Sequence, residues 1–136
     1  MKGRVLIVED DANFARIVQL ALKPEGYAVD VAGDAESAMS RLTGNAFDVV
    51  VTDLKLPGAS GVELLEWIMQ NLSPAPTVFV MTAFATVNTA IDAMKKGAAD
   101  YLTKPFSNDE LIIAIRKALR LRSLEDENRI LKEALV

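Results

Sequence analysis

Short apolar runs alternate with stretches of helical period along this chain. The apolar runs predict strands at residues 5–8, 28–32, 47–52, 77–81 and 100–103. Several runs are continuously apolar rather than alternating, which is the pattern of parallel strands covered on both faces. Because helical stretches separate the strands, right-handed crossovers should connect them. The pattern therefore predicts an open, doubly wound α/β fold with a parallel sheet of five strands.

Apolar residues recur at helical spacing in three of the intervening stretches. They form the stripes Phe14, Ile17, Val18, Ala21 and Leu22; Val87, Ala90, Ile91 and Met94; and Leu111, Ile112, Ile115 and Leu119. Each stripe is expected to face the sheet.

Local signals mark where the helices begin and end. Asp34 is a suitable N-cap for the second helix, and residues 107–110, read as SNDE, have the spacing of a capping box. Residues 24–26, read as PEG, should stop the first helix. Gly97 stands where the fourth helix needs a left-handed terminus.

Composition narrows the class of protein. The 136 residues, 51% hydrophobic and 25% charged, indicate a single folded domain, and the net charge of −4 argues against direct nucleic-acid binding. The absence of cysteine and histidine excludes disulfides, thiolate zinc sites and serine–histidine catalysis. No apolar run reaches the ~18 residues of a membrane span, and the N-terminus is not a signal peptide, so a cytoplasmic protein is expected.

Mostly polar residues follow four of the predicted strands. They are Glu9, Asp10 and Asp11; Asp53; Thr82 and Ala83; and Lys104 and Pro105. In a flavodoxin-like sheet with strand order 2-1-3-4-5 the first and third strands are neighbours. Asp10, Asp11 and Asp53 should then meet at the edge where such sheets bind ligands. Carboxylates gathered there repel one another unless a cation intervenes, and all-oxygen ligation suits Mg²⁺.

The same edge carries groups suited to phosphoryl chemistry. Lys104 offers a positive charge to a phosphoryl oxygen, and Thr82 and the backbone N–H of Ala83 offer donors. Asp53 is then the candidate nucleophile, which would form an aspartyl phosphate. Taken singly, each residue has a plainer interpretation, and Asp11 alone is more often a helix cap than a ligand. The combination at one edge favours the chemical interpretation.

Other phosphate-handling motifs are missing from the sequence. The chain has neither GxGxxG nor GxxxxGK(S/T), so neither a dinucleotide site nor a P-loop is indicated. A phosphatase with an aspartate nucleophile would want a second carboxylate two residues after Asp53, where this chain has Lys55.

Four motifs resemble the receiver domain of bacterial two-component response regulators. They are VLIVEDD, DVVVTDLKLPG, VMTA and DYLTKPF, in that order between residue 2 and about residue 121. The resemblance implies a CheY-like fold with Asp53 as phospho-acceptor, phosphorylated by a sensor histidine kinase in trans. It also implies Mg²⁺ bound by Asp53, directly by Asp11, mainly through water by Asp10, and by the backbone carbonyl of Lys55.

The resemblance also implies how the phosphoryl group is held and sensed. Thr82 and Lys104 would hold its oxygens, with a cis bond plausible after Lys104. Thr82 and Tyr101 would form a coupled switch, in which the hydroxyl moves toward the phosphate and the ring turns inward. The face around the fourth helix and fifth strand is then repacked. One departure is Ser60, since many members have aspartate before the residue that is Gly61 here; serine caps a helix about as well.

The receiver domain is expected to span residues 1–121, and its C-terminal helix should extend into a helical linker at 122–136. A heptad with a and d positions at Leu121, Leu124, Asn128, Leu131 and Leu135 runs along this tail. A single asparagine at an a position sets register and dimer state, and the charges at positions 120 and 127 would face opposite charges at 125 and 132 of a parallel partner. A homodimeric coiled coil is predicted; a solvated helical extension is the alternative.

These features predict a phosphorylation-switched signalling domain, not an enzyme, that controls transcription. Residues 81–106 are similar to the branch of response regulators fused to an ATPase that activates an alternative-sigma-factor polymerase. Either the chain is a piece of such a regulator, with ATPase and DNA-binding output domains, or its output passes through a protein partner. The rival hypotheses are a small Mg²⁺-dependent phosphatase and a pseudo-receiver that only dimerises.

Overall fold

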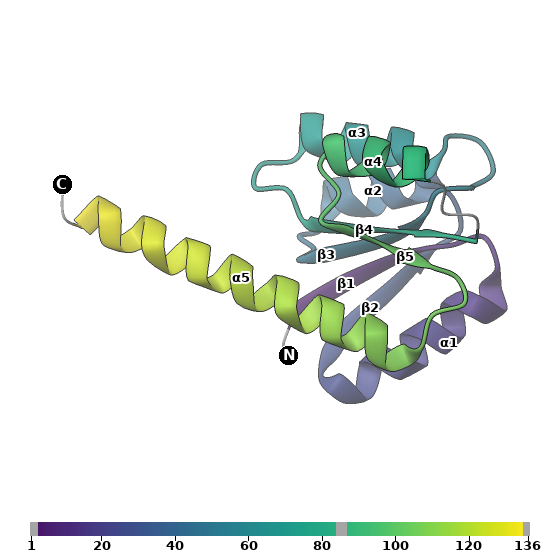
Figure 1. Ribbon diagram of the computed structural model, residues 1–136, viewed down its shortest axis with the longest axis horizontal. Coiled ribbons are helices and arrows are strands. Elements are labelled where there is room, and N and C mark those ends of the chain that lie inside the picture. Colours follow the sequence, from purple (N-terminus) through teal and green to yellow (C-terminus); the bar gives the residue numbers. More distant parts are fainter. Residues whose placement is uncertain (1–2, 84–86, 135–136) are drawn as a thin grey trace.

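The computed structural model describes residues 3–83 and 87–134, which form a single parallel sheet with helices on both faces (Figure 1). The strands are β1 (Gly3–Val8), β2 (Tyr27–Ala32), β3 (Val49–Asp53), β4 (Thr77–Thr82) and β5 (Asp100–Thr103). They are ordered β2-β1-β3-β4-β5, and every neighbouring pair is parallel. The predicted five-stranded doubly wound sheet and its strand order are confirmed.

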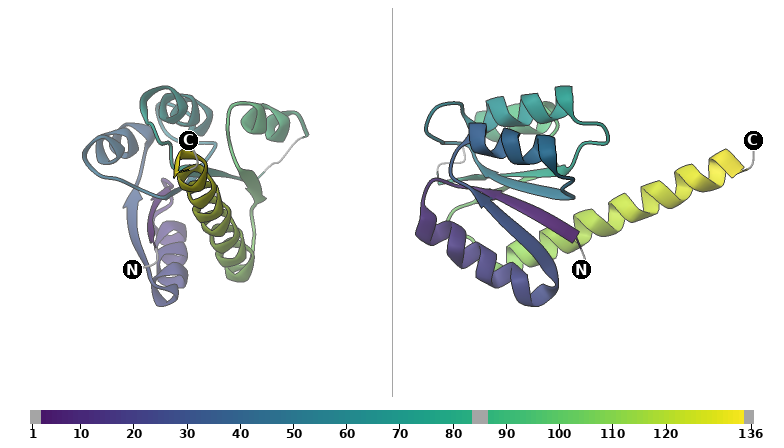
Figure 2. Two further views of the ribbon diagram at one scale, coloured as in Figure 1. Left: turned by 90° about the vertical axis from the view of Figure 1, so that its left-hand side faces the viewer. Right: turned by 180° about the vertical axis from the view of Figure 1, so that it is seen from behind.

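The helices lie in two layers around this sheet (Figure 2). One layer holds α1 (Ala12–Leu22) and α5 (Asn108–Ala134), and the other holds α2 (Ala35–Gly44), α3 (Gly61–Asn71) and α4 (Val87–Lys95). A short 3₁₀ helix, η1 (Lys23–Glu25), follows α1. The described helices include none long and apolar enough to cross a membrane.

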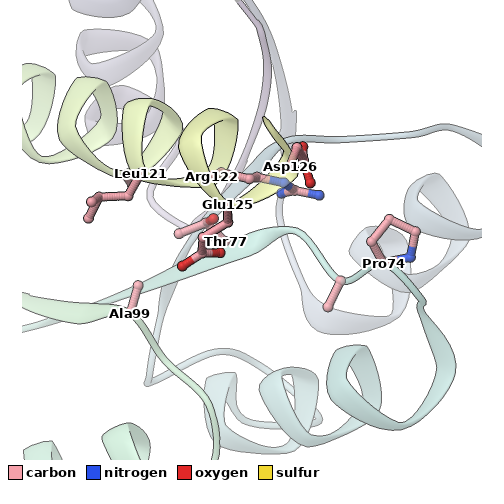
Figure 3. Close-up of a pocket in the computed structure, with 9 residues that line it drawn as sticks. Pro74, Thr77, Ala99, Leu121, Arg122, Glu125 and Asp126 are labelled. Carbon is pink, nitrogen blue, oxygen red and sulfur yellow. The ribbon is translucent and has the colours of Figure 1, made fainter. Parts of the chain in front are cut away.

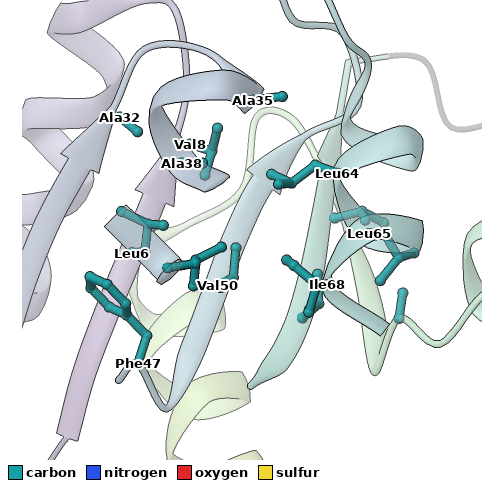
Figure 4. Close-up of a cluster of buried hydrophobic side chains, with 14 of the residues drawn as sticks. Leu6, Val8, Ala32, Ala35, Ala38, Phe47, Val50, Leu64, Leu65 and Ile68 are labelled. Atoms are coloured by element: carbon teal, nitrogen blue, oxygen red, sulfur yellow. The ribbon is translucent and has the colours of Figure 1, made fainter. Parts of the chain in front are cut away.

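Each face of the sheet has its own hydrophobic core. Leu6 and Val50 point toward α2 and α3, where they pack near Leu64 and Ile68 (Figure 4). Their neighbours on the strands, such as Val51, belong to the cluster under α1 and α5. Since successive side chains of a strand point to opposite faces, covering both faces requires every position to be apolar. This explains the continuously apolar runs in the sequence.

The predicted helix ends are confirmed. The side chain of Asp34 accepts from the N–H of Ser37 at 2.7 Å, and Ser107 caps α5 by accepting from a backbone N–H at 3.1 Å. Gly26 and Gly97 have φ values of 94° and 113°, a left-handed conformation that favours glycine. These boundaries were predictable because each depends on a few adjacent residues.

Two of the predicted inward stripes are wrong in part. On α1, Ile17 is 56% exposed and Ala15 is buried instead. On α4, Ile91 and Met94 are exposed while Ala93 is fully buried, and the side chain of Val87 lies outside the described residues. In both helices the apolar surface is wider than the buried face, and a small alanine is buried instead. The third stripe is confirmed, with buried or half-buried residues throughout.

Helix α5 continues through the predicted domain boundary at position 121 without a break and extends away from the sheet (Figure 1). Its 27 residues include most of the predicted linker. Arg122 Nη1 donates to the backbone carbonyl of Asp48 at 2.8 Å, next to the start of β3. The first residue beyond the predicted boundary is therefore still bound to the domain.

Candidate functional site

The carboxyl ends of β1, β3, β4 and β5 meet at a pocket of about 500 Å³. Its lining consists of Asp10, Asp53, Lys55, Leu56, Pro57, Thr82, Ala83 and Lys104. β3 is the middle strand of the five-stranded sheet and lies between β1 and β4, and Asp53 is its last residue. The sequence-predicted residues Asp10, Asp53, Thr82 and Lys104 are therefore brought together, as the strand order requires.

Backbone hydrogen bonds hold the strand ends in place. The N–H of Leu54 donates to the carbonyl of Met81 at 3.0 Å, and the N–H of Lys104 donates to the carbonyl of Thr82 at 2.8 Å. The bond between Lys104 and Pro105 is cis, as the resemblance implied. The side chains of the pocket thus project from a rigid edge.

Helix α3 begins directly against the end of β3. The side chain of Ser60 caps the helix, and the N–H of Gly61 donates to the carbonyl of Leu54 at 2.9 Å. A Cβ atom at Gly61 would overlap the carbonyl oxygen of Asp53 and lie 2.8 Å from the Cα of Leu54. Glycine is required here because the two backbones touch.

Lys104 is the central cation of the pocket. Its Nζ lies 2.8 Å from Glu9 Oε1 and 3.0 Å from Asp53 Oδ2, and only 18% of its side chain is exposed. Burial opposes its charge, but the hydrogen bonds to the two carboxylates prevail and raise the pKa of Lys104. Lys104 is therefore a fixed ammonium beside the nucleophile candidate.

Asp53 is buried yet ionised. Burial opposes its charge, but the neighbouring Glu9 carboxyl, the ammonium of Lys104 and the N–H of Lys55 outweigh burial and lower the pKa of Asp53. That N–H donates to Asp53 Oδ1 at 3.1 Å, while Oδ2 faces Lys104. A carboxylate held in this way is available as a nucleophile at neutral pH.

Glu9 belongs to the site, although the sequence indicated only that it stands at a strand end. It is 3% exposed, and burial followed by the adjacent Asp53 raises the pKa of Glu9 to about 7. Its buried Oε2 has no hydrogen-bond partner among the described residues. Its position directly after an apolar strand, before two further acids, was the signal that could have identified it.

Glu9, Asp10 and Asp53 offer carboxylate oxygens that all lie within 4.8 Å of one another. This all-oxygen set, with one buried oxygen unpartnered among the described groups, fits a hard cation such as Mg²⁺. Asp11 is outside the group: its Oδ1 accepts from the N–H groups of Asn13 and Phe14 at 3.1 Å each. Asp11 is the N-cap of α1, while the direct metal ligation that the resemblance implies stays a prediction.

Tyr101 lies on a different face of the molecule. It is 40% exposed on β5 and, with residues of α4, lines a pocket of about 440 Å³. Apolar side chains of Ile91 and Met94 form much of this surface. Thr82, the other residue of the predicted switch, is half-buried at the end of β4.

A further pocket of about 370 Å³ lies between α5 and the loop before β4 (Figure 3). Leu121, Arg122, Glu125 and Asp126 line it from α5, opposite Pro74 and Thr77. Since Thr77 begins β4, this pocket is at the amino end of that strand, remote from the cluster around Asp53 at the carboxyl ends.

The chain is similar to known proteins in both sequence and structure. The family described as "Response regulator receiver domain" matches residues 5–116. The chain is 36% identical to the Regulatory protein AtoC of Escherichia coli, over 98% of this chain and 29% of that protein. It is 39% identical to the Alginate biosynthesis transcriptional regulatory protein AlgB of Pseudomonas aeruginosa, over 94% of this chain and 30% of that protein. The chain therefore spans less than a third of the length of these two relatives.

Solved structures agree with the sequence matches. NtrX from Brucella abortus superposes with a TM-score of 0.89 at 30% identity, covering 96% of this chain and 30% of that one. The receiver domain of the Francisella response regulator 1452 superposes with a TM-score of 0.83 at 31% identity, covering 88% of this chain and 98% of that one. The match thus covers nearly all of an isolated receiver domain and most of this chain.

Proposed function

Because this chain belongs to the response regulator receiver domain family, we propose that Asp53 accepts a phosphoryl group and that its phosphorylation controls transcription. The donor is the phosphohistidine of a sensor histidine kinase, in trans because the chain has no histidine. The observation that carries the proposal is the contact of Lys104 with the ionised Asp53, at an edge where further acids lie within 4.8 Å.

The transfer is a displacement at phosphorus. A carboxylate oxygen of Asp53 attacks the phosphorus atom, the P–N bond to the donor histidine breaks, and the released imidazole keeps the electron pair and takes up a proton. The product is an acyl phosphate, which water later hydrolyses to restore Asp53. Little covalent work falls to the protein, so its contribution is positioning and electrostatic stabilisation.

Residues around Asp53 have distinct roles in this proposal. Lys104 shifts from the carboxylate to a phosphoryl oxygen, while the hydroxyl of Thr82 and the N–H of Ala83 donate to the others. Mg²⁺ would be held by Asp10, Asp53 and the backbone carbonyl of Lys55, and it supplies positive charge that offsets the charge of the phosphoryl group. In this proposal Asp11 serves mainly as the N-cap of α1, toward which its Oδ1 is turned, and the direct ligation of Mg²⁺ that the resemblance implies is the alternative.

The output of the switch is proposed to pass through two regions. Phosphorylation would draw the Thr82 hydroxyl inward and let the exposed ring of Tyr101 follow, which repacks the α4–β5 face. The tail of α5 would pair with a second copy as a parallel coiled coil. The similarity to AtoC and AlgB, which are longer, supports output domains that bind DNA and hydrolyse ATP in the full-length regulator.

Phosphorylation by a small-molecule donor tests the proposal. With acetyl phosphate and Mg²⁺ the intact mass of the chain should rise by one phosphoryl group, and EDTA or Asp53→Ala should abolish the increase. A stable, stoichiometric product supports a receiver. Steady turnover of phosphate esters, without accumulation of that product, would instead support the Mg²⁺-dependent phosphatase. An unmodified chain under all conditions would favour a pseudo-receiver.

A further inference from the structure

An aromatic ring lies against the cation of the phosphorylation site. The Nζ atom of Lys104 is 4.4 Å from the centroid of the Phe14 ring. Only 18% of the Lys104 side chain is exposed, so the ring meets an ammonium that has lost much of its hydration. The negative face of an aromatic ring attracts a cation, and the attraction grows where water is excluded.

Phe14 is itself fixed from two directions. Its backbone N–H donates to Asp11 Oδ1 at 3.1 Å, so the N-cap of α1 sets the first turn that carries the ring. Phe106, two residues after Lys104, meets the ring edge-to-face with the centroids 5.7 Å apart and the planes at 86°. The ring thus connects the start of α1 with the segment that carries Lys104.

The surroundings of Lys104 make such a fixed contact useful. Two carboxylates compete for its ammonium, Glu9 at 2.8 Å and Asp53 at 3.0 Å. A lysine side chain has a flexible four-carbon stem, so without a third contact it could settle on Glu9 alone. A ring face attracts a cation without prescribing one hydrogen-bond direction. Lys104 is therefore able to turn from the Asp53 carboxylate to a phosphoryl oxygen while it stays over Phe14.

We propose that Phe14 is a positioning residue for phosphoryl transfer, whose ring holds the Lys104 ammonium beside Asp53 as the phosphoryl group arrives. Phe14 acts through Lys104 and does not touch the reacting atoms. The proposal rests on the proposed function of Asp53. It also gives Asp11 an indirect role, because the cap that this residue provides orients the ring.

Two aromatic and two non-aromatic replacements of Phe14 test the proposal in the full chain. Phe14→Met and Phe14→Leu keep an apolar side chain without a ring, while Phe14→Tyr and Phe14→Trp keep a ring face. The rate constant for phosphorylation by acetyl phosphate at saturating Mg²⁺ should fall about threefold to tenfold in the first pair and stay near the wild-type value in the second. The Mg²⁺ dissociation constant, measured by calorimetry, should be unchanged in all four.

The outcomes separate the possibilities. Phosphorylation rates equal to the wild-type rate in all four variants overturn the proposal. Equal slowing in all four also overturns it, since that would mean that packing of the side chain, not its ring face, matters. Slowing that is matched by weaker Mg²⁺ binding also overturns it, because a displaced α1 would disturb Asp10. Thermal melts show which variants fold. One folded variant without a ring and one folded variant with a ring are enough for the comparison. A wild-type chain that is not phosphorylated would contradict the function of Asp53 instead.

Discussion

Three consecutive acidic residues follow β1 and face three different surroundings. Glu9 contacts Lys104, Asp10 borders the pocket beside Asp53, and Asp11 caps α1. The sequence placed all of them at the correct edge because they follow an apolar strand. It could not separate their roles, because the direction of each side chain depends on the residue at which the strand ends and the helix begins.

The different roles of Asp10 and Asp11 give a matched pair of variants. Asp10→Asn should weaken Mg²⁺ binding by about tenfold or more, because ligand charge governs the affinity of such sites. Asp11→Asn should bind Mg²⁺ almost as well as the wild type, since asparagine caps a helix about as well as aspartate. Calorimetric titration with Mg²⁺ checks both. An equal loss of Mg²⁺ affinity in the two variants would show that Asp11 is a metal ligand as well.

Glu9 should make the stability of the metal-free protein depend on pH. Its pKa is about 7 in the fold against an ordinary value of 4.5, so folding favours the protonated form. The stabilisation is fully present below pH 4.5 and is lost as the pH rises through about 7. Urea unfolding in EDTA should show that Glu9→Gln gains roughly 1 to 3 kcal/mol relative to the wild type across this window. A difference that does not change with pH would contradict this assignment.

At the scale of the elements, local signals were sufficient for helix ends but not for helix faces. The cap at Asp34 and the left-handed Gly97 depend on adjacent residues, and both are confirmed. The inward face of α4 depends on what the helix packs against, and there Ala93 is buried while Ile91 and Met94 are exposed. The misassigned stripe is itself informative, because these exposed side chains border Tyr101 on the proposed switch face.

At the junction of β3 and α3, one added methyl group should strongly lower the stability of the fold. Gly61→Ala should destabilise the fold by roughly 2 kcal/mol or more, because the new Cβ would overlap the backbone at Asp53. Gly44 is the last residue of α2, and a Cβ atom added there would meet no atom within 4 Å. Gly44→Ala is therefore the control. It should be neutral or stabilising by up to about 1 kcal/mol. Urea unfolding of the two variants measures the contrast, and equal stabilities would contradict the close approach.

At the scale of the whole molecule, α5 joins the phosphorylation domain to the tail. The sequence predicted an extended C-terminal helix, which is confirmed, but it did not reveal that Arg122 contacts the carbonyl of Asp48. Arg122 and Asp48 are 74 residues apart in the sequence, so their contact could be found only in the folded structure. A continuous helix can transmit a change in the domain to whatever follows the tail.

Substitutions at two adjacent residues of similar size, Ile130 and Leu131, test the coiled-coil prediction. Leu131 at a d position and Ile130 at a c position are 61% and 59% exposed in the single chain. Leu131→Glu should weaken self-association by about tenfold or more, because burial of one leucine contributes roughly 1.5–3 kcal/mol, whereas Ile130→Glu should not. Sedimentation equilibrium measures both. Unchanged association of Leu131→Glu would exclude this seam.

Two parts of that prediction remain beyond the described residues. Leu135, its last a position, is one, and the side chain of Lys132, which would pair with Glu127, is the other. The described positions Leu121, Leu124 and Asn128 are exposed along the same helix, so they are accessible to a second helix.

We propose that the acids and the lysine at one edge of the sheet make Asp53 the site of phosphorylation. Borohydride reduction of the acetyl-phosphate-treated chain converts an aspartyl phosphate to homoserine, and peptide mapping then locates it. Homoserine is expected at position 53, in the tryptic peptide spanning residues 42–55, only when Mg²⁺ is present. Homoserine at another aspartate, or a phosphorylated chain with an unchanged residue 53, would contradict it.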